Sequence, residues 1–247
     1  MGRAGAAQES GMVWLVAQRS WKGYVWPLPA AIGAYATLAY VEPTATLGAS
    51  TTPTPTPIAY FASFAAFAAA VADDALPAGL RYVAYDPEKW SATPLNEQQD
   101  PVTYLRAFTE LANAHGLGSV LVPARDLMLV TGGICVKRQG ETLSQAFLRC
   151  DIAAGSVGAD YFVVQGAPVE VSPSTYQSLV RAVSAQVQEQ SPGTAVLATV
   201  NPARAPISSL ATLLQSTRPY VSGYEVNCTP ATVETAAELM ALVDNSA

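Results

Sequence analysis

Residues 160–206 read DYFVVQGAPVEVSPSTYQSLVRAVSAQVQEQSPGTAVLATVNPARAP. Two short, nearly unbroken apolar runs at 160–164 and 195–200 enclose a segment at 172–190, which opens with Ser-Pro. Proline directly after a serine cap is a frequent start of a helix. Continuous apolar runs are typical of strands buried on both faces of a parallel sheet. The stretch therefore predicts a strand, a loop, a helix and a second parallel strand.

The same unit recurs upstream and downstream of this stretch. We expect further strands at 81–85, 119–122 and 221–226, and further helices at 100–115, 141–154, 206–217 and from 229 onward. Strands that alternate with helices in this way imply a parallel sheet with right-handed crossovers.

Five strands follow residue 80, and one or two more from the front of the chain would give six or seven. We therefore predict an α/β fold built as a TIM-like (β/α) barrel, incomplete or irregular in outline. An open, doubly wound parallel sheet is the alternative. The Gly-rich dinucleotide fingerprint follows none of the strands, which argues against a nucleotide-binding sheet. No cofactor is expected, and a single histidine without Cys/His spacing predicts no metal site.

The front end of the chain allows two interpretations. Residues 12–18 have the pattern of a short apolar strand, and residues 24–41 carry no charge and follow the basic residues Arg19 and Lys22. An uncharged run after a basic pair is a feature of signal peptides and membrane anchors. The prolines inside the run instead favour a loop followed by a barrel strand at 37–41, and we prefer this folded interpretation.

A Thr-Pro tract at 51–57 separates the front end from the regular part of the chain. Alternating threonine and proline favours an extended linker without core-forming side chains. We expect an N-terminal segment over 1–57 and a barrel-like domain over 58–247. Residues 58–74 are expected to form a helix, because phenylalanine recurs there at every third position.

The composition narrows the class of protein. Half of the 247 residues are hydrophobic and 13% are charged, so the chain is too apolar for disorder. The formal net charge is −6, and the basic residues form no stripe that could neutralise phosphates. We therefore expect no nucleic-acid partner and no stable membrane span, and a secreted protein, extracellular or at the cell surface.

Three cysteines are present. Cys135 and Cys150 are expected to form a disulfide in an exported protein. Closing a loop of about 15 residues contributes ~3 kcal/mol in the chain-entropy model. Two buried free thiols are the alternative. The odd count leaves at least one cysteine unpaired in a monomer, and the pairing of Cys228 stays open.

Polar side chains gather at the expected carboxyl ends of the strands, where ligands bind in either architecture. Alternation along the strands lets Asp86, Glu88 and Glu225 point into one cavity. Glycoside cleavage commonly uses two carboxyl groups, so these three acids are the candidate catalytic residues. Alternatively, the Asp86-Pro87-Glu88 segment only shapes a turn.

Other strand-end residues are candidates for substrate binding. Arg125 could hold an anion, although an ion pair with Asp126 is slightly favoured. Tyr85 and Trp90 could stack on sugar rings. The full candidate binding set is Arg125, Asp126, Gln165, Asn201, Asn227, Tyr85 and Trp90.

Three motifs carry a family resemblance: Tyr-Asp-Pro-Glu-Lys-Trp at 85–90, Leu-Ala-Asn-Ala-His-Gly-Leu at 111–117 and Pro-Ala-Arg-Asp-Leu at 123–127. With them the chain resembles secreted bacterial barrel proteins related to glycoside hydrolases, roughly over residues 80–230. The Asp-x-x-Asp-x-Asp-x-Glu pattern of chitinase-like barrels is absent from the sequence.

The resemblance implies an exported barrel enzyme that acts on a glycan. A non-catalytic barrel that binds carbohydrate or cell wall is nearly as well supported. A lyase or isomerase for another small molecule is a third hypothesis, because a fold does not fix a function.

Overall fold

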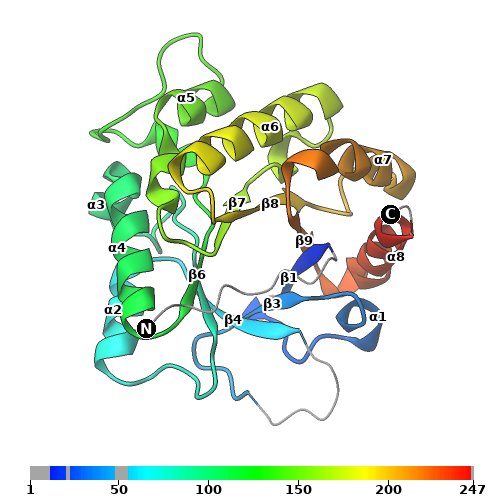
Figure 1. Cartoon of the computed structure of the whole chain (residues 1–247), viewed down its shortest axis with the longest axis horizontal. Helices are drawn as coiled ribbons and strands as arrows, with labels where there is room; N and C mark the ends of the chain where they lie inside the picture. The colour runs from blue at the N-terminus through cyan, green and yellow to red at the C-terminus, as the bar shows by residue number, and fades with distance from the viewer. Residues whose placement is uncertain (1–11, 21–22, 48–54, 246–247) are drawn as a thin grey trace.

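The computed structural model describes residues 12–20, 23–47 and 55–245 (Figure 1). Its sheet has nine strands, of which β2 (Gly23–Tyr24) pairs antiparallel with β1 outside the ring. The other eight run parallel and close into a barrel where the first strand pairs with the last. They are β1 (Val13–Ser20), β3 (Leu38–Val41), β4 (Thr56–Phe61), β5 (Tyr82–Tyr85), β6 (Gly118–Leu121), β7 (Tyr161–Val164), β8 (Ala195–Val200) and β9 (Gly223–Cys228).

Helices surround the ring on its outer side (Figure 1). The α-helices are α1 (Ala30–Gly33), α2 (Phe64–Ala72), α3 (Leu95–Gln99), α4 (Pro101–Ala114), α5 (Leu143–Arg149), α6 (Pro173–Gln190), α7 (Ile207–Thr217) and α8 (Val233–Asp244). Short 3-10 helices are η1 (Arg125–Leu129), η2 (Ile152–Ser156), η3 (Ala167–Val169), η4 (Arg218–Tyr220) and η5 (Pro230–Thr232). The predicted TIM-like barrel is therefore confirmed, and its ring of strands is complete.

Local signals start several helices where the sequence predicts them. Asp100 accepts a hydrogen bond from the Thr103 backbone N–H and precedes Pro101, so α4 begins at that proline. Helix α6 likewise runs from Pro173 to Gln190, as expected.

Two layers of side chains form the core. Leu15, Tyr40, Ile58 and Ala84 point into the barrel, whereas residues of opposite parity, such as Trp14, pack between the sheet and the helices. Alternation along each strand separates the two sets. Residues an even number of positions from Leu15 in β1, or from Ala84 in β5, also face inward. The same alternation determines which residues at the ends of the strands face the mouth of the barrel.

The front of the chain belongs to the same ring. The strands expected at 12–18 and 37–41 are present in β1 and β3, and β1 pairs with both β3 and β9. The division expected at residue 57 falls inside β4, so strands from both sides of it share one sheet. In the described ranges, none of the helices has the length and apolar character needed to cross a bilayer.

The helix expected at 58–74 was wrong in its first part. Residues 56–61 form β4, which pairs with β3 on one side and β5 on the other. Helix α2 begins only at Phe64, after Ser63 has capped it by accepting from the Ala66 N–H. Pairing with two neighbouring strands overrides the three-residue phenylalanine spacing. Residues 55–57 of the Thr-Pro tract lead into and start β4, and its residues 51–54 lie outside the described ranges.

The disulfide between Cys135 and Cys150 is present, with a Cα–Cα distance of 5.7 Å. The helix expected at 141–154 is shorter, because α5 ends at Arg149 and Cys150 is its C-terminal cap. Asp151 then adopts a left-handed conformation with φ of 50°, and η2 follows. The bridge therefore ties the loop after η1 to the end of α5.

Candidate functional site

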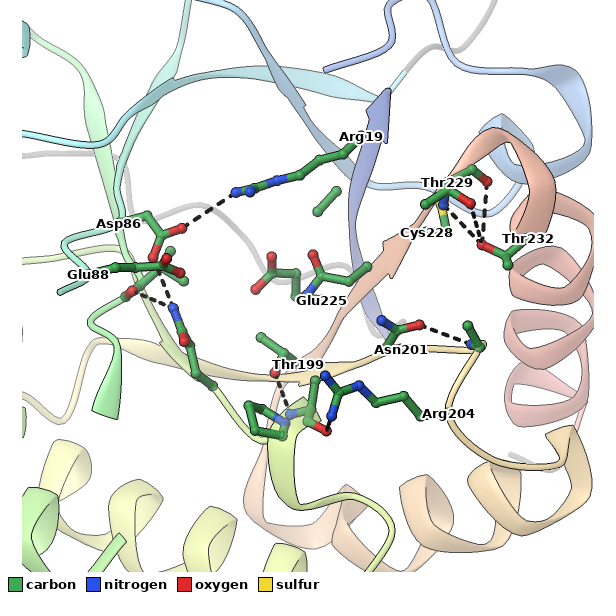
Figure 2. Close-up of a pocket in the computed structure, with 17 residues that line it drawn as sticks. Arg19, Asp86, Glu88, Thr199, Asn201, Arg204, Glu225, Cys228, Thr229 and Thr232 are labelled. Carbon is green, nitrogen blue, oxygen red and sulfur yellow. Dashed lines mark hydrogen bonds and ion pairs between the residues drawn. The ribbon is translucent and has the colours of Figure 1, made fainter. Parts of the chain in front are cut away.

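A cavity of about 340 Å³ opens at the carboxyl ends of the strands (Figure 2). Asp86, Glu88 and Glu225 line it together, as alternation along β5 and β9 predicts. Gln165, Asn201 and Asn227, three of the predicted binding residues, line it as well. The cavity therefore brings six of the predicted site residues to one mouth.

Asp86 directly follows β5 and keeps the inward parity of Ala84. Its backbone N–H donates to the Phe61 carbonyl, which extends the pairing with β4 by one residue. One carboxyl oxygen accepts a 2.9 Å hydrogen bond from the Gln165 amide, and the other accepts a 3.0 Å bond from the Tyr60 hydroxyl. Asp86 is thus buried and held on both oxygens.

Glu225 lies in β9, paired between Leu15 of β1 and Thr199 of β8, and its side chain enters the barrel. It is only 4% exposed, and its Oε2 atom has no hydrogen-bond partner. Burial raises the pKa of Glu225 to about 8, and the negative charge of Asp86 adds to the rise. The carboxyl therefore holds its proton at neutral pH.

Glu88 is the most solvated of the three acids, because it is half-buried where Asp86 and Glu225 are buried. Burial and the nearby charge of Asp126 raise its pKa, whereas the Arg19 guanidinium lowers it. Burial raises the pKa of Asp86 to about 8, against the Tyr60 hydrogen bond and Arg19. Three acids around one mouth therefore carry fewer than three negative charges at neutral pH.

Arg19 was missed as a site residue, because the sequence interpretation treated it as part of a basic pair before an uncharged run. It lies near the end of β1, with the inward parity of Leu15 and Ala17. Its guanidinium lies 3.7 Å from Asp86 Oδ2 and over the rings of Tyr24 and Tyr60, at 5.0 and 5.3 Å from their centroids. Parity along the first strand would have identified it.

Tyr85 and Trp90, the two predicted stacking residues, lie outside the cavity lining. Tyr85 has the opposite parity to Asp86, so its ring packs under the helices and its hydroxyl donates to Glu97. The Trp90 indole N–H donates to Thr93.

Arg125 and Asp126 also lie outside the lining, in η1. Arg125 donates to the Ser144 hydroxyl, and Asp126 accepts from the Lys89 backbone N–H. The ion pair expected between these two residues is not formed in the described chain.

The remaining wall of the cavity comes from the ends of β8 and β9 and carries Thr199, Arg204, Cys228, Thr229 and Thr232 (Figure 2). Burial raises the pKa of the Cys228 thiol to about 12, so it stays neutral. The described residues hold no group of three or more His, Cys, Asp or Glu side chains arranged to bind a metal ion.

No protein-family model matches the chain, and no curated protein matches it. Several solved structures are similar to this chain. The homocysteine methyltransferase MmuM from Escherichia coli is 12% identical, with 96% of this chain and 98% of that chain covered and a TM-score of 0.52. The catalytic domain of a family GH18 chitinase from the fern Peteris ryukyuensis is 13% identical, with coverages of 87% and 76% and a TM-score of 0.46. An archaeal fructose-1,6-bisphosphate aldolase is 14% identical, with coverages of 78% and 73% and a TM-score of 0.44.

The closed ring of parallel strands and the likeness to the methyltransferase over nearly all of both chains define the class: the protein has a TIM-barrel fold. At such low identity the likeness shows the fold alone. A fold of this kind hosts many chemistries, and the function depends on the residues of the cavity.

Proposed function

We propose that this protein is a glycoside hydrolase-like enzyme that acts on a small glycan through Glu225 and Glu88. One observation carries the proposal: a buried carboxyl with a free Oε2 atom shares one cavity with a more solvated carboxyl. Glycoside cleavage needs an acid that is protonated at neutral pH and a carboxylate that is ionised. Glu225 is buried and Glu88 is half-buried, and this contrast favours Glu225 as the acid and Glu88 as the carboxylate.

Glu225 is the proton donor. Its proton passes to the glycosidic oxygen while the bond from that oxygen to the anomeric carbon breaks, and Glu225 is left as a carboxylate. Glu88, in its carboxylate form, supplies the opposing electron pair in one of two ways. It bonds to the anomeric carbon, and a water deprotonated by the Glu225 carboxylate then cleaves this ester and releases the sugar, or it deprotonates a water that attacks the anomeric carbon directly. The configuration of the released sugar distinguishes these two routes, because the first retains and the second inverts the anomeric centre.

Asp86 is a positioning residue for this pair. It is fixed by hydrogen bonds from Gln165 and Tyr60 and lies close to Arg19. When Asp86 ionises, its negative charge raises the pKa of Glu225 further, so the two buried carboxyls do not both lose their protons near neutral pH.

The shape of the cavity favours a small substrate. A volume of about 340 Å³ lies near the lower end of the range for ligand pockets. The described residues that line it include no aromatic side chain that could stack on successive sugars. A sugar with one or two rings therefore fits this site better than a long polysaccharide.

The disulfide is compatible with an oxidising compartment, and an extracellular location stays a prediction.

The test is hydrolysis of a panel of 4-nitrophenyl glycosides and disaccharides by the wild type and by Glu225→Gln and Glu88→Gln variants. We expect each variant to lose about 10²–10⁴-fold in kcat/KM on disaccharides. Because 4-nitrophenolate leaves without a proton, Glu225→Gln should lose much less on the nitrophenyl substrates than Glu88→Gln does.

Glu189→Gln, an exposed site at the end of α6, is the matched control and should keep wild-type rates. Hydrolysis that is unchanged in both site variants would refute the assignment. Binding of sugars by the folded wild type without any turnover would instead identify a non-catalytic carbohydrate-binding barrel.

A further inference from the structure

The wall formed by the ends of β8 and β9 differs in charge from the wall that carries Asp86 and Glu88. We infer that it binds an anionic group, a carboxylate or phosphate, on the substrate, and that Arg204 is the residue that holds it. The inference adds a specificity to the proposed function. It depends on that function in one respect only, namely that the molecule carrying the anionic group is a sugar.

The Arg204 guanidinium has N–H groups that are available to bind a ligand. It lies in the turn after β8, where its backbone N–H donates to the Asn201 carbonyl at 3.1 Å. Within the described chain its guanidinium makes only two long contacts, 3.4 Å to the Ala167 carbonyl and 3.9 Å to Glu170. The side chain is 47% exposed and lines the cavity. A guanidinium has five N–H donors in a planar fork that matches carboxylate and phosphate oxygens, so most of these donors remain for a ligand.

Glu170 fixes the turn without neutralising Arg204. Its buried carboxyl accepts a 2.9 Å hydrogen bond from the Asn201 backbone N–H, while its Oε1 atom has no hydrogen-bond partner. Burial raises the pKa of Glu170 to about 7, so part of the population is uncharged at neutral pH. Because the contact between Glu170 and Arg204 is long, Glu170 offsets the positive charge of the guanidinium only in part, and this charge still acts on the cavity.

Asn201 adds a second donor on the same wall. Its side-chain oxygen accepts from the Ala203 backbone N–H at 2.9 Å, which fixes the orientation of the amide. The amide nitrogen then lies on the other side, toward the cavity, as Figure 2 shows. A guanidinium and an amide N–H₂ group from one turn form a compact donor set for an oxyanion.

The opposite wall gives the substrate its direction. Asp86 and Glu88 lie across the mouth from Arg204 (Figure 2). The Arg19 guanidinium on that side lies 3.7 Å from Asp86 Oδ2 and over the rings of Tyr24 and Tyr60, and the negative charge that the carboxyls share disfavours an anion there. The anionic group is thereby directed to Arg204, and the neutral glycosidic bond faces the carboxyls. Charges of opposite sign on two walls select orientation as well as ligand class.

Calorimetric titration in the Glu225→Gln background measures binding without turnover. The three probes are glucose, glucuronate and glucose 6-phosphate, which are neutral, carboxylate-bearing and phosphate-bearing. We expect at least one anionic sugar to bind tenfold or more tightly than glucose, and the stronger of the two identifies the anion. Arg204→Gln should reduce this preference to less than threefold, and Arg204→Lys should retain part of it.

Arg138→Gln is the matched control, since it removes the same charge from an exposed residue outside the cavity and should leave the preference intact. Thermal unfolding of each variant verifies that it is folded. Equal affinity for all three sugars, or an anion preference that survives in Arg204→Gln, would overturn the inference.

The same set of variants separates this inference from the proposed hydrolysis. Turnover of neutral glycosides with no preference for anionic ones would overturn the anion site and leave the hydrolase in place. Anion binding that depends on Arg204, in a wild type that cleaves no glycoside, would support the anion site and refute the hydrolase.

Discussion

The Tyr60 hydroxyl donates a 3.0 Å hydrogen bond to Asp86 Oδ2, and this bond joins the ends of two neighbouring strands at the mouth of the barrel. The bond opposes the burial that raises the pKa of Asp86. In the fraction of molecules in which Asp86 is ionised, its negative charge in turn raises the pKa of Glu225. Tyr60 therefore influences the proposed acid although it does not line the cavity.

Replacing Tyr60 with phenylalanine should lower the pKa of Glu225. Without the hydroxyl the pKa of Asp86 rises, Asp86 carries less negative charge at neutral pH, and Glu225 releases its proton more easily. The descending alkaline limb of the kcat/KM profile, expected near pH 8 in the wild type, should move to lower pH by about half a unit to one unit. Tyr220→Phe, at the opposite end of the barrel, should leave the limb in place. An alkaline limb that stays fixed in Tyr60→Phe would disprove the coupling.

The raised pKa values of Asp86 and Glu225 predict how the free energy of unfolding depends on pH. Both groups have pKa values of about 8 in the folded chain, against ordinary values of 3.8 for aspartate and 4.5 for glutamate. Between those limits the folded state binds more protons than the unfolded state, so stability is highest at the acidic end and falls as the pH rises toward 8. The slope approaches about 1.4 kcal/mol per pH unit for each extra proton held by the folded state.

Urea unfolding at pH 5, 6.5 and 8 measures this slope. Glu225→Gln removes one of the two groups and should flatten the curve, leaving the variant more stable than the wild type at pH 8. The contrary result, a wild type that becomes more stable between pH 5 and 8, would mean that the buried carboxyls are ionised without cost.

The regular part of the fold could be predicted because its signals are local. Asp100-Pro101 and Ser172-Pro173 each mark a helix start within a few residues, and β8 is an apolar run interrupted only by Thr199. Strand β4 could not be predicted, because its first residues belong to a Thr-Pro tract. It is a strand only because β3 and β5 pair with it on both sides.

The candidate site, like the fold, could be predicted from the sequence where its signals are local. Alternation along single strands places Asp86 and Glu225 in the barrel, and the opposite parity of Tyr85 could have excluded it from the cavity. Arg19 reaches Asp86 because β1 joins the ring between β9 and β3. Parity gives the inward direction of Arg19, but only the pairing of β1 with β3 and β9 shows that this first strand belongs to the ring.

The disulfide should stabilise the fold without affecting the cavity. Cys135 and Cys150 are 15 positions apart, and neither lines the cavity. The double variant Cys135→Ser, Cys150→Ser should lose ~3 kcal/mol of unfolding free energy in the chain-entropy model. Sugar binding at 25 °C should be unchanged. Adding a reductant should lower the melting temperature of the wild type but not that of the double variant, and an effect on both would assign the change to something other than this bridge.

Glu97 should be among the most sensitive residues outside the cavity. One oxygen accepts from the Phe64 N–H at 2.7 Å and the other from the Ala65 N–H at 3.0 Å, so the carboxylate lies at the positive end of α2. The Tyr85 hydroxyl donates a further 2.7 Å bond. Since Glu97 is buried, Glu97→Ala leaves three donors without an acceptor and should destabilise the fold by about 3 kcal/mol or more.

Chemical denaturation of Glu97→Ala beside Glu110→Ala, an exposed glutamate on α4, measures the difference. Tyr85→Phe removes one of the three donors and should cost about 1 kcal/mol, less than the loss of the acceptor itself. If Glu97→Ala cost no more than the exposed control, water would have to replace the carboxylate at the start of α2. The contact between the β5–α4 connection and α2 would then contribute nothing to holding this side of the barrel together.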